Sequence, residues 1–195
     1  MKRFSVATMS LSLLLLAGVS TLAQERVTFT GTALIYGSGF NTRTVTRNFT
    51  LRLNGTTSDQ QANRALSTLQ ENGQDALLKT IRNEDLGTFS LGGQPALTVN
   101  AVRIDNVGGR QRVRAVLERW IGFGELRGGY RSVDYPFSYI EILVDPRNGR
   151  GEGTFIPAAK IRFKENNGQP QVEIEDFGTF PGRLMGVSMR GRMQQ

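Results

Sequence analysis

The sequence predicts an α+β protein that is mainly β, with a twisted antiparallel sheet forming a sandwich or a partly closed barrel. Two observations support this class. Short segments in which apolar and polar residues alternate recur along the chain, separated by turns rich in glycine and asparagine. One segment, at about residues 59–82, has helical periodicity instead, and we expect it to pack on the sheet.

The first 23 residues are expected to be a signal peptide rather than part of the fold. Two basic residues precede a mostly apolar stretch at residues 6–19, and Thr21-Leu22-Ala23 supplies small residues before a cleavage site. The apolar stretch is short for a transmembrane span, and no later stretch is apolar enough to cross a bilayer. We therefore expect an exported protein, periplasmic or secreted, in which residues 24–195 form a single globular domain.

The chain contains no cysteine and no histidine. Disulfides and a lipid anchor at a cleavage-site cysteine are therefore excluded, as are Ser-His-Asp and Cys-His nucleophiles and conventional zinc sites. No P-loop or dinucleotide-binding motif occurs either. We expect no catalytic residue, no metal and no cofactor.

The N-terminal strands are predicted at residues 26–36 and 42–53, joined by a turn at 37–41. The first is rich in β-branched residues, and Gly31 within it marks a candidate bulge. In the second half of the second strand, Phe49, Leu51 and Leu53 alternate with Thr50 and Arg52, which predicts one buried and one solvent-exposed face.

The helical segment follows, with Ser58 as N-cap and Gln61 completing a capping box. Its apolar residues return every three or four positions, and Gly73 interrupts them. The sequence predicts two short helices, or one with a break, whose apolar stripe packs against a sheet.

The remaining strands are predicted as short segments and hairpins. One hairpin turns at Asn106-Val107-Gly108-Gly109, and another at Asn166-Asn167-Gly168-Gln169 with complementary charges on its outer face. The predicted strands cover residues 86–91, 97–105, 111–121, 137–144, 153–156, 160–165 and 171–176.

A six-residue pattern occurs twice, as EDLGTF from Glu84 and EDFGTF from Glu175. The repeat can be interpreted as a structural corner that occurs twice or as a shared binding role for Asp85 and Asp176. We prefer the corner, because nothing else near the copies matches.

The candidate binding surface lies between Trp120 and Tyr139, where glycines alternate with aromatic, arginine and carboxylate side chains. Aromatic faces with a few orienting polar groups suit a small apolar or glycan-like ligand. The structural alternative is a core-lining strand followed by an ordered connection. The candidate ligand-binding residues are Trp120, Phe123, Glu125, Arg127, Tyr130, Arg131, Asp134 and Tyr135.

The neighbouring hairpin is rich in arginine but has few interleaved aromatic residues, so nucleic-acid binding is a poor fit. A carboxylate pair is the enzymatic alternative, since glycoside hydrolysis needs only two carboxyl groups at a suitable separation. Its candidates are Glu118, Glu125, Asp134 and Glu141.

The stretch ERWIGFGELRGGYRSVDYPFSYIEILVDPRNGRGEGTFIPAAKIRFKE, with the later FGTFPGRLMGV, resembles a family of exported bacterial proteins of unknown function. The resemblance implies a bacterial source and a single domain. It implies no activity and no site residue.

Three functions remain, in order of preference. The first is a non-enzymatic ligand-binding or interaction domain of the bacterial envelope. The second is a structural or assembly component with an envelope protein partner, joined through an edge strand or the basic C-terminal tail. The third is a carboxylate-dependent hydrolase of an exported polymer.

Expression of the full chain in a bacterium tests the export prediction. We expect the periplasmic fraction to contain a chain that begins at Gln24, because the small residues before it suit the signal peptidase. Intact mass spectrometry of that fraction checks the cleavage. A full-length chain that stays in the cytoplasm would contradict it.

Overall fold

A computed structural model of the chain describes residues 26–36, 44–121, 123–166, 169–178 and 181–191. The expected signal peptide and the turn at 37–41 lie outside these residues, as does the Asn167-Gly168 part of the last hairpin turn. The elements are β1 Val27–Ile35, β2 Val45–Leu53, α1 Asp59–Ile81, β3 Gly87–Leu91, β4 Leu97–Val107, β5 Arg110–Glu118, α2 Phe123–Gly128, the 3₁₀ helix η1 Arg131–Asp134, β6 Phe137–Val144, β7 Arg150–Asn166, β8 Gln169–Asp176 and β9 Gly182–Arg190.

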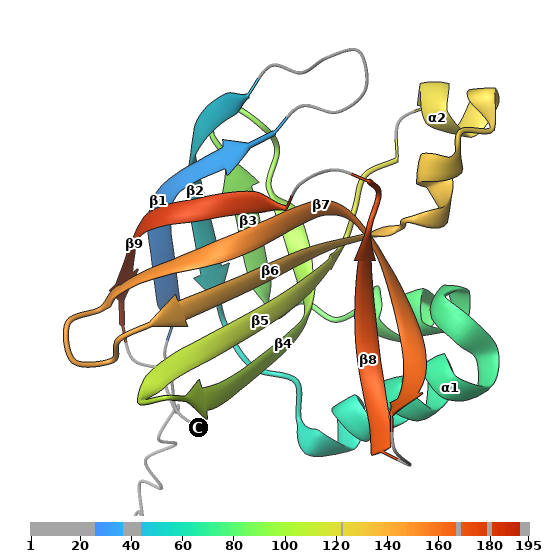
Figure 1. Ribbon diagram of the computed structural model, residues 1–195, viewed down its shortest axis with the longest axis horizontal. Helices are drawn as coiled ribbons and strands as arrows, with labels where there is room; N and C mark the ends of the chain where they lie inside the picture. Colours follow the sequence, from blue (N-terminus) through green and yellow to red (C-terminus); the bar gives the residue numbers. More distant parts are fainter. Residues whose placement is uncertain (1–25, 37–43, 122, 167–168, 179–180, 192–195) are drawn as a thin grey trace, which may run out of the picture.

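Eight of the nine strands form a closed antiparallel barrel (Figure 1). Strands β1 to β7 each pair with the next, and β9 lies between β7 and β1, so that the ring has no open edge. Strand β8 stands outside the ring and pairs with the second half of β7. The mainly β class is therefore confirmed, and of the two expected architectures the barrel is the one observed.

The barrel interior is filled by the apolar side of each alternating strand. Phe49, Leu51 and Leu53 of β2 are buried as their alternation predicted. The predicted bulge at Gly31 is also present, as a register shift between Thr30 and Thr32 in the β1–β9 pairing. The buried interior comprises Val27, Phe29, Ala33, Phe49, Leu51, Leu53, Phe89, Val99, Val102, Val113, Ala115, Leu117, Ile140, Ile142, Val144, Phe155, Leu184 and Val187.

Strand β7 is one element, whereas the sequence predicted two strands at 153–156 and 160–165. Its first half approaches β6 so closely that a Cβ atom at Gly153 would lie 2.2 Å from the Glu141 carbonyl oxygen. A Cβ atom at Gly151 would lie 2.3 Å from the Leu143 carbonyl oxygen. These two glycines permit the β6–β7 pairing that closes the ring.

Helix α1 has the predicted cap and the predicted break. The Ser58 side chain accepts a hydrogen bond from the Gln61 amide while the Gln61 side chain accepts one from the Ser58 amide. At Gly73 the backbone leaves helical geometry, with φ 76°. The helix packs on the outer side of the barrel and does not cover either end (Figure 1).

A second core lies between α1, the outer face of β6 and the extension of β7. The helix contributes Leu69, Leu77 and Ile81 from its apolar stripe. The β7–β8 hairpin adds to this core, and its register pairs Ile161 with Ile174 as its sequence predicted. The buried strand residues of this core are Phe137, Tyr139, Ile156, Ala159 and Ile161.

The connection from β5 to β6 differs from the expectation. Strand β5 ends at Glu118 rather than at Ile121, and the short helices α2 and η1 follow in a stretch for which no helix was predicted. We call the described residues between Glu118 and Phe137 the β5–β6 arm. It projects from one end of the barrel (Figure 1).

The two copies of the repeated pattern have one local hydrogen bond in common. The Asp85 carboxylate accepts a hydrogen bond from the Gly87 amide, and the Asp176 carboxylate accepts one from the Gly178 amide. Gly87 begins β3 with φ 145°, whereas Gly178 has φ 61° and follows the end of β8. The two copies therefore share the aspartate–glycine hydrogen bond but not the backbone conformation at glycine, and Thr179 and Phe180 of the second copy lie outside the described residues.

Asn100 joins three elements at the β4 bulge, where the β4–β5 register shifts. Its side-chain amide donates to the carbonyl oxygens of Arg82 and Glu84 at 3.1 Å, after α1. Its side-chain oxygen accepts from the Glu118 amide at 2.8 Å, at the end of β5. Because Asn100 is 3% exposed, water cannot replace these bonds.

Replacing Asn100 with alanine should lower the free energy of unfolding by about 3 kcal/mol, since three backbone groups lose their partner in a buried place. Urea denaturation measures the change. Asn106→Ala is the matched control, because Asn106 is exposed on the same strand. Equal stabilities of the two variants would contradict this role of Asn100.

Candidate functional site

The end of the barrel where β1, β3 and β5 finish lies at the top of Figure 1, and we call it the mouth. A cavity of ≈ 860 Å³ lies in this mouth. Ligand pockets in proteins usually measure about 300–1,000 Å³, so its size suits a small molecule. The lining residues are mainly apolar and come from separate segments: Ile35, Phe89, Leu91, Gln94, Pro95, Ala96, Leu97, Arg119, Trp120, Ser138, Phe155 and Pro157.

Aromatic rings line the inner part of the mouth cavity. The rings of Phe89 and Phe155 are 5.1 Å apart, tilted at 45°, and both side chains belong to the barrel core. Phe49 continues the contact at 6.2 Å from Phe89. The cavity is thus continuous with a packed aromatic interior, which gives it a fixed apolar wall.

Trp120 lies at the rim of the same cavity. It is 79% exposed and is the only tryptophan in the chain. Burial of such a side chain is favourable, and a ligand in the mouth would supply that burial. The structure therefore places one of the residues predicted from the sequence at the cavity.

The side chain of Arg119, the residue before Trp120, holds the arm in place through several polar contacts. Its guanidinium donates to the carbonyl oxygens of Tyr135 at 2.7 Å and Ser132 at 2.8 Å. It also forms an ion pair with Glu125 at 3.2 Å, and the Ser132 hydroxyl donates to the same carboxylate at 2.6 Å. Glu125 is therefore engaged within the protein, whereas the sequence suggested a ligand-facing carboxylate.

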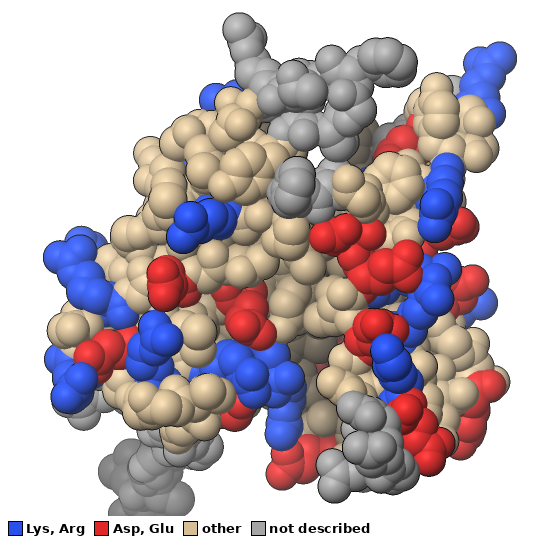
Figure 2. All heavy atoms as spheres, viewed as in Figure 1, with Lys and Arg blue, Asp and Glu red and all other residues tan. Residues whose placement is uncertain are grey.

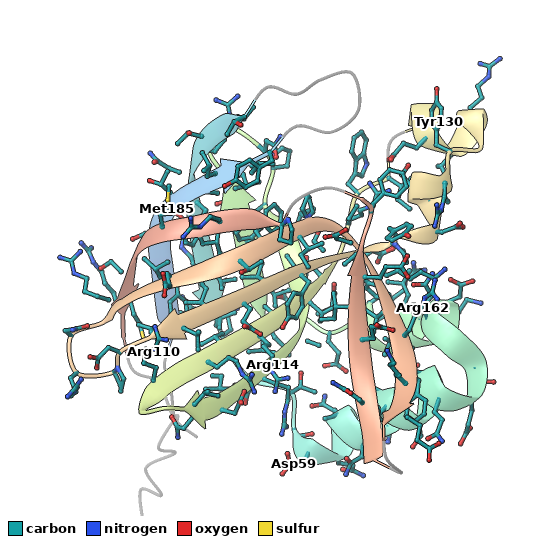
Figure 3. All side chains as sticks on the ribbon, in the orientation of Figure 1. Asp59, Arg110, Arg114, Tyr130, Arg162 and Met185 are labelled. Atoms are coloured by element: carbon teal, nitrogen blue, oxygen red, sulfur yellow. The ribbon has the colours of Figure 1, made fainter. Side chains whose placement is uncertain are left out.

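The other predicted site residues do not gather at the cavity. Arg127, Tyr130, Arg131 and Asp134 are exposed along the arm, and Figure 3 shows Tyr130 near its outer end. The side chain of Phe123 lies outside the described residues. The predicted residues thus form an arm beside the mouth rather than a concave site.

Tyr135 is buried on the inner side of the arm. Its hydroxyl donates to the Glu175 carboxylate at 2.5 Å, and its ring meets Phe177 edge-on at 5.1 Å. The hydrogen bond holds the pKa of Glu175 below its ordinary value and raises the pKa of Tyr135. This contact fastens the arm to β8, so Tyr135 has a structural role.

The carboxylates proposed for catalysis are dispersed. Glu118 pairs with Arg82 at 2.7 Å, and Glu141 accepts a hydrogen bond from the Tyr139 hydroxyl at 2.9 Å on the outer face of the barrel. Asp134 is exposed on η1. Among the described residues, no cluster of three or more acidic side chains could hold a metal ion.

The arginines of the β4–β5 hairpin each have a carboxylate partner. Asp105 lies between Arg112 and Arg114, and the hydrogen bond from Arg112 is the main cause that lowers the pKa of Asp105. Basic and acidic side chains accordingly intermingle on the face seen in Figure 2. The remaining pairs of the hairpin are Arg103 with Asp59 and Arg110 with Glu152.

Sequence reasoning missed most of the cavity lining. Ile35, Phe89 and Phe155 belong to three distant segments, and nothing local to any of them indicates a shared site. These side chains meet only because the order of the strands in the sheet brings them to the same end of the barrel.

Fold and site together define an antiparallel eight-stranded barrel with an apolar cavity at one end. No family model matches the chain, and comparisons with curated proteins and with solved structures found no similar protein. In the part of the chain that the structure describes, no helix is long and apolar enough to span a membrane.

The Tyr135–Glu175 bond predicts a pH-dependent effect of Tyr135→Phe. Because the bond lowers the pKa of Glu175, its contribution to stability is present above the ordinary pKa of 4.5 and is lost as the pH falls below the folded value. The variant should therefore be less stable than the wild type at neutral pH, and the difference should shrink in acid. Urea denaturation at both pH values measures it.

Tyr130→Phe is the control, since Tyr130 is exposed on the same arm. It should match the wild type at both pH values. A Tyr135→Phe penalty that is equal at neutral and acid pH would contradict the assigned cause.

Proposed function

We propose that the protein binds a small apolar molecule in the barrel mouth and performs no catalysis. The observation that carries this proposal is the cavity of ≈ 860 Å³, lined mainly by apolar side chains and open to solvent beside an exposed tryptophan. Barrels of eight strands have interiors just large enough to be filled by side chains or to admit one small ligand. Here the interior is packed, and the space lies at its end.

The polar groups around the cavity favour an apolar ligand over a glycan. Arg119 already donates to Tyr135, Ser132 and Glu125. The Ser138 hydroxyl, which is buried, donates to the Pro157 carbonyl oxygen at 2.9 Å. A sugar needs many hydrogen-bond partners, whereas an apolar ligand needs only a few that fix its orientation.

The alternative of an assembly component would use β8, the end strand of the sheet. Its charged side chains pair across the hairpin, Glu173 with Lys164 at 3.4 Å and Glu175 with Arg162 at 2.8 Å. Charges along an edge strand oppose the addition of another strand. This supports placing assembly second to ligand binding.

Export completes the proposal. The expected signal peptide suits a protein that works in the bacterial envelope or outside the cell. In that compartment a protein of this kind would carry an apolar molecule through water, in which such molecules dissolve poorly.

Binding of the uncharged dye N-phenylnaphthylamine tests the proposal. The dye fluoresces in apolar surroundings, and energy transfer from Trp120 reports that it is bound near the mouth. Ala96→Phe should weaken binding at least about tenfold, because the larger side chain occupies the cavity. Titration of the purified protein with the dye gives both affinities.

Ala96→Ser is the matched control at the same position, and it should keep the affinity of the wild type because it leaves the cavity open. The proposal fails if the wild type does not bind the dye. It also fails if Ala96→Phe binds as tightly as Ala96→Ser while remaining folded.

A further inference from the structure

The large apolar side chains that remain exposed are unevenly distributed over the described residues. Trp120 is 79% exposed, Tyr130 62% and Leu126 58%, and all three belong to the β5–β6 arm. The next most exposed are Val172 at 46% on β8, Val107 at 41% on β4 and Met185 at 38% on β9. A concentration of exposed apolar side chains on one element indicates an interaction surface, whereas scattered ones need no explanation.

The shape of the arm favours a bilayer over a protein partner. The arm projects from the barrel, so it would reach a flat surface ahead of the neighbouring strands (Figures 1 and 3). A stable protein interface buries about 800 Å² on each partner, whereas an aromatic side chain buries about 150–250 Å². Three side chains fall short of such an interface, but a bilayer adapts to a small protrusion.

The charges of the arm also suit a lipid surface. Arg127 and Arg131 are exposed on the arm against one exposed carboxylate, Asp134, and neither arginine has an ion pair among the described residues. Glu125, the other carboxylate of the arm, is paired with Arg119 instead. Figure 2 shows a cationic side chain at the tip of the arm. Tryptophan and tyrosine favour the interface of a bilayer, and arginine favours anionic headgroups.

We propose that the β5–β6 arm docks on the surface of an anionic lipid bilayer. Trp120, Leu126 and Tyr130 enter the headgroup region, and Arg127 contacts lipid phosphate. The docked arm brings the barrel mouth close to the lipid surface, because Trp120 belongs to both. The inference goes beyond ligand binding in the mouth and does not depend on it.

Vesicles of equimolar phosphatidylglycerol and phosphatidylethanolamine test this docking with the chain that follows the signal peptide. Trp120 is the only tryptophan, so its emission should shift to the blue when the arm inserts. Co-sedimentation gives the affinity. The double variant Leu126→Ser, Tyr130→Ser should bind at least about tenfold more weakly, because it loses the apolar area that enters the bilayer.

Arg127→Gln should weaken binding about fivefold on the same vesicles. It should have little effect on vesicles of phosphatidylcholine, which carry no net charge. Met185→Ser is the matched control, because it removes an exposed apolar side chain from β9, far from Tyr130 in Figure 3. This control should bind as the wild type does.

The docking proposal is overturned if the double variant, with its unfolding midpoint unchanged, binds vesicles as the wild type does. It is also overturned if binding leaves the Trp120 emission unshifted, since the contact would then lie elsewhere. Dye titration without vesicles separates the two proposals, because neither Leu126 nor Tyr130 lines the cavity. A wild type that binds the dye but not the vesicles refutes docking alone, and a wild type that binds the vesicles but not the dye refutes the mouth site alone.

Discussion

Closure of the barrel depends on β7, because this strand pairs with β6 on one edge and with β9 on the other. Gly151 and Gly153 make the approach to β6 possible, since a Cβ atom at either place would overlap backbone of that strand. The strand then continues beyond the ring and pairs with β8. One strand therefore closes the first core and builds a wall of the second.

The second core explains where α1 lies. Its apolar surface draws α1 to the outer side of β6 and β7, and Asn100 fixes the end of that helix to β4 and β5. The helix is thus held away from the barrel end. At the opposite end the connection from β2 to β3 contains this helix, and the β4–β5 turn is tight at Gly108-Gly109. At the mouth β5 continues into the arm, which lies beside the cavity.

The sequence indicated the right segment for the candidate site but not the roles within it. Its mixture of aromatic, arginine and carboxylate residues suggested one surface that faces a ligand. In the fold these residues have different roles. Glu125 forms an ion pair with Arg119, and Tyr135 donates a hydrogen bond to Glu175. Because these contacts lie within the protein, the polar groups of Glu125 and Tyr135 hold the arm in place. Trp120 and Tyr130 remain exposed because no element of the described chain covers them.

The sequence by itself determined the local elements, since their causes are local. Alternation placed Phe49, Leu51 and Leu53 on one buried face, the Ser58–Gln61 box began the helix, and the β6 strand was predicted with its observed bounds. Only the tertiary structure decided that the sheet closes into a ring and that distant side chains such as Phe89 and Phe155 share a cavity. Closure requires β9 to pair with β1 across nearly the whole chain, and contacts of that range leave no periodic signal in the sequence.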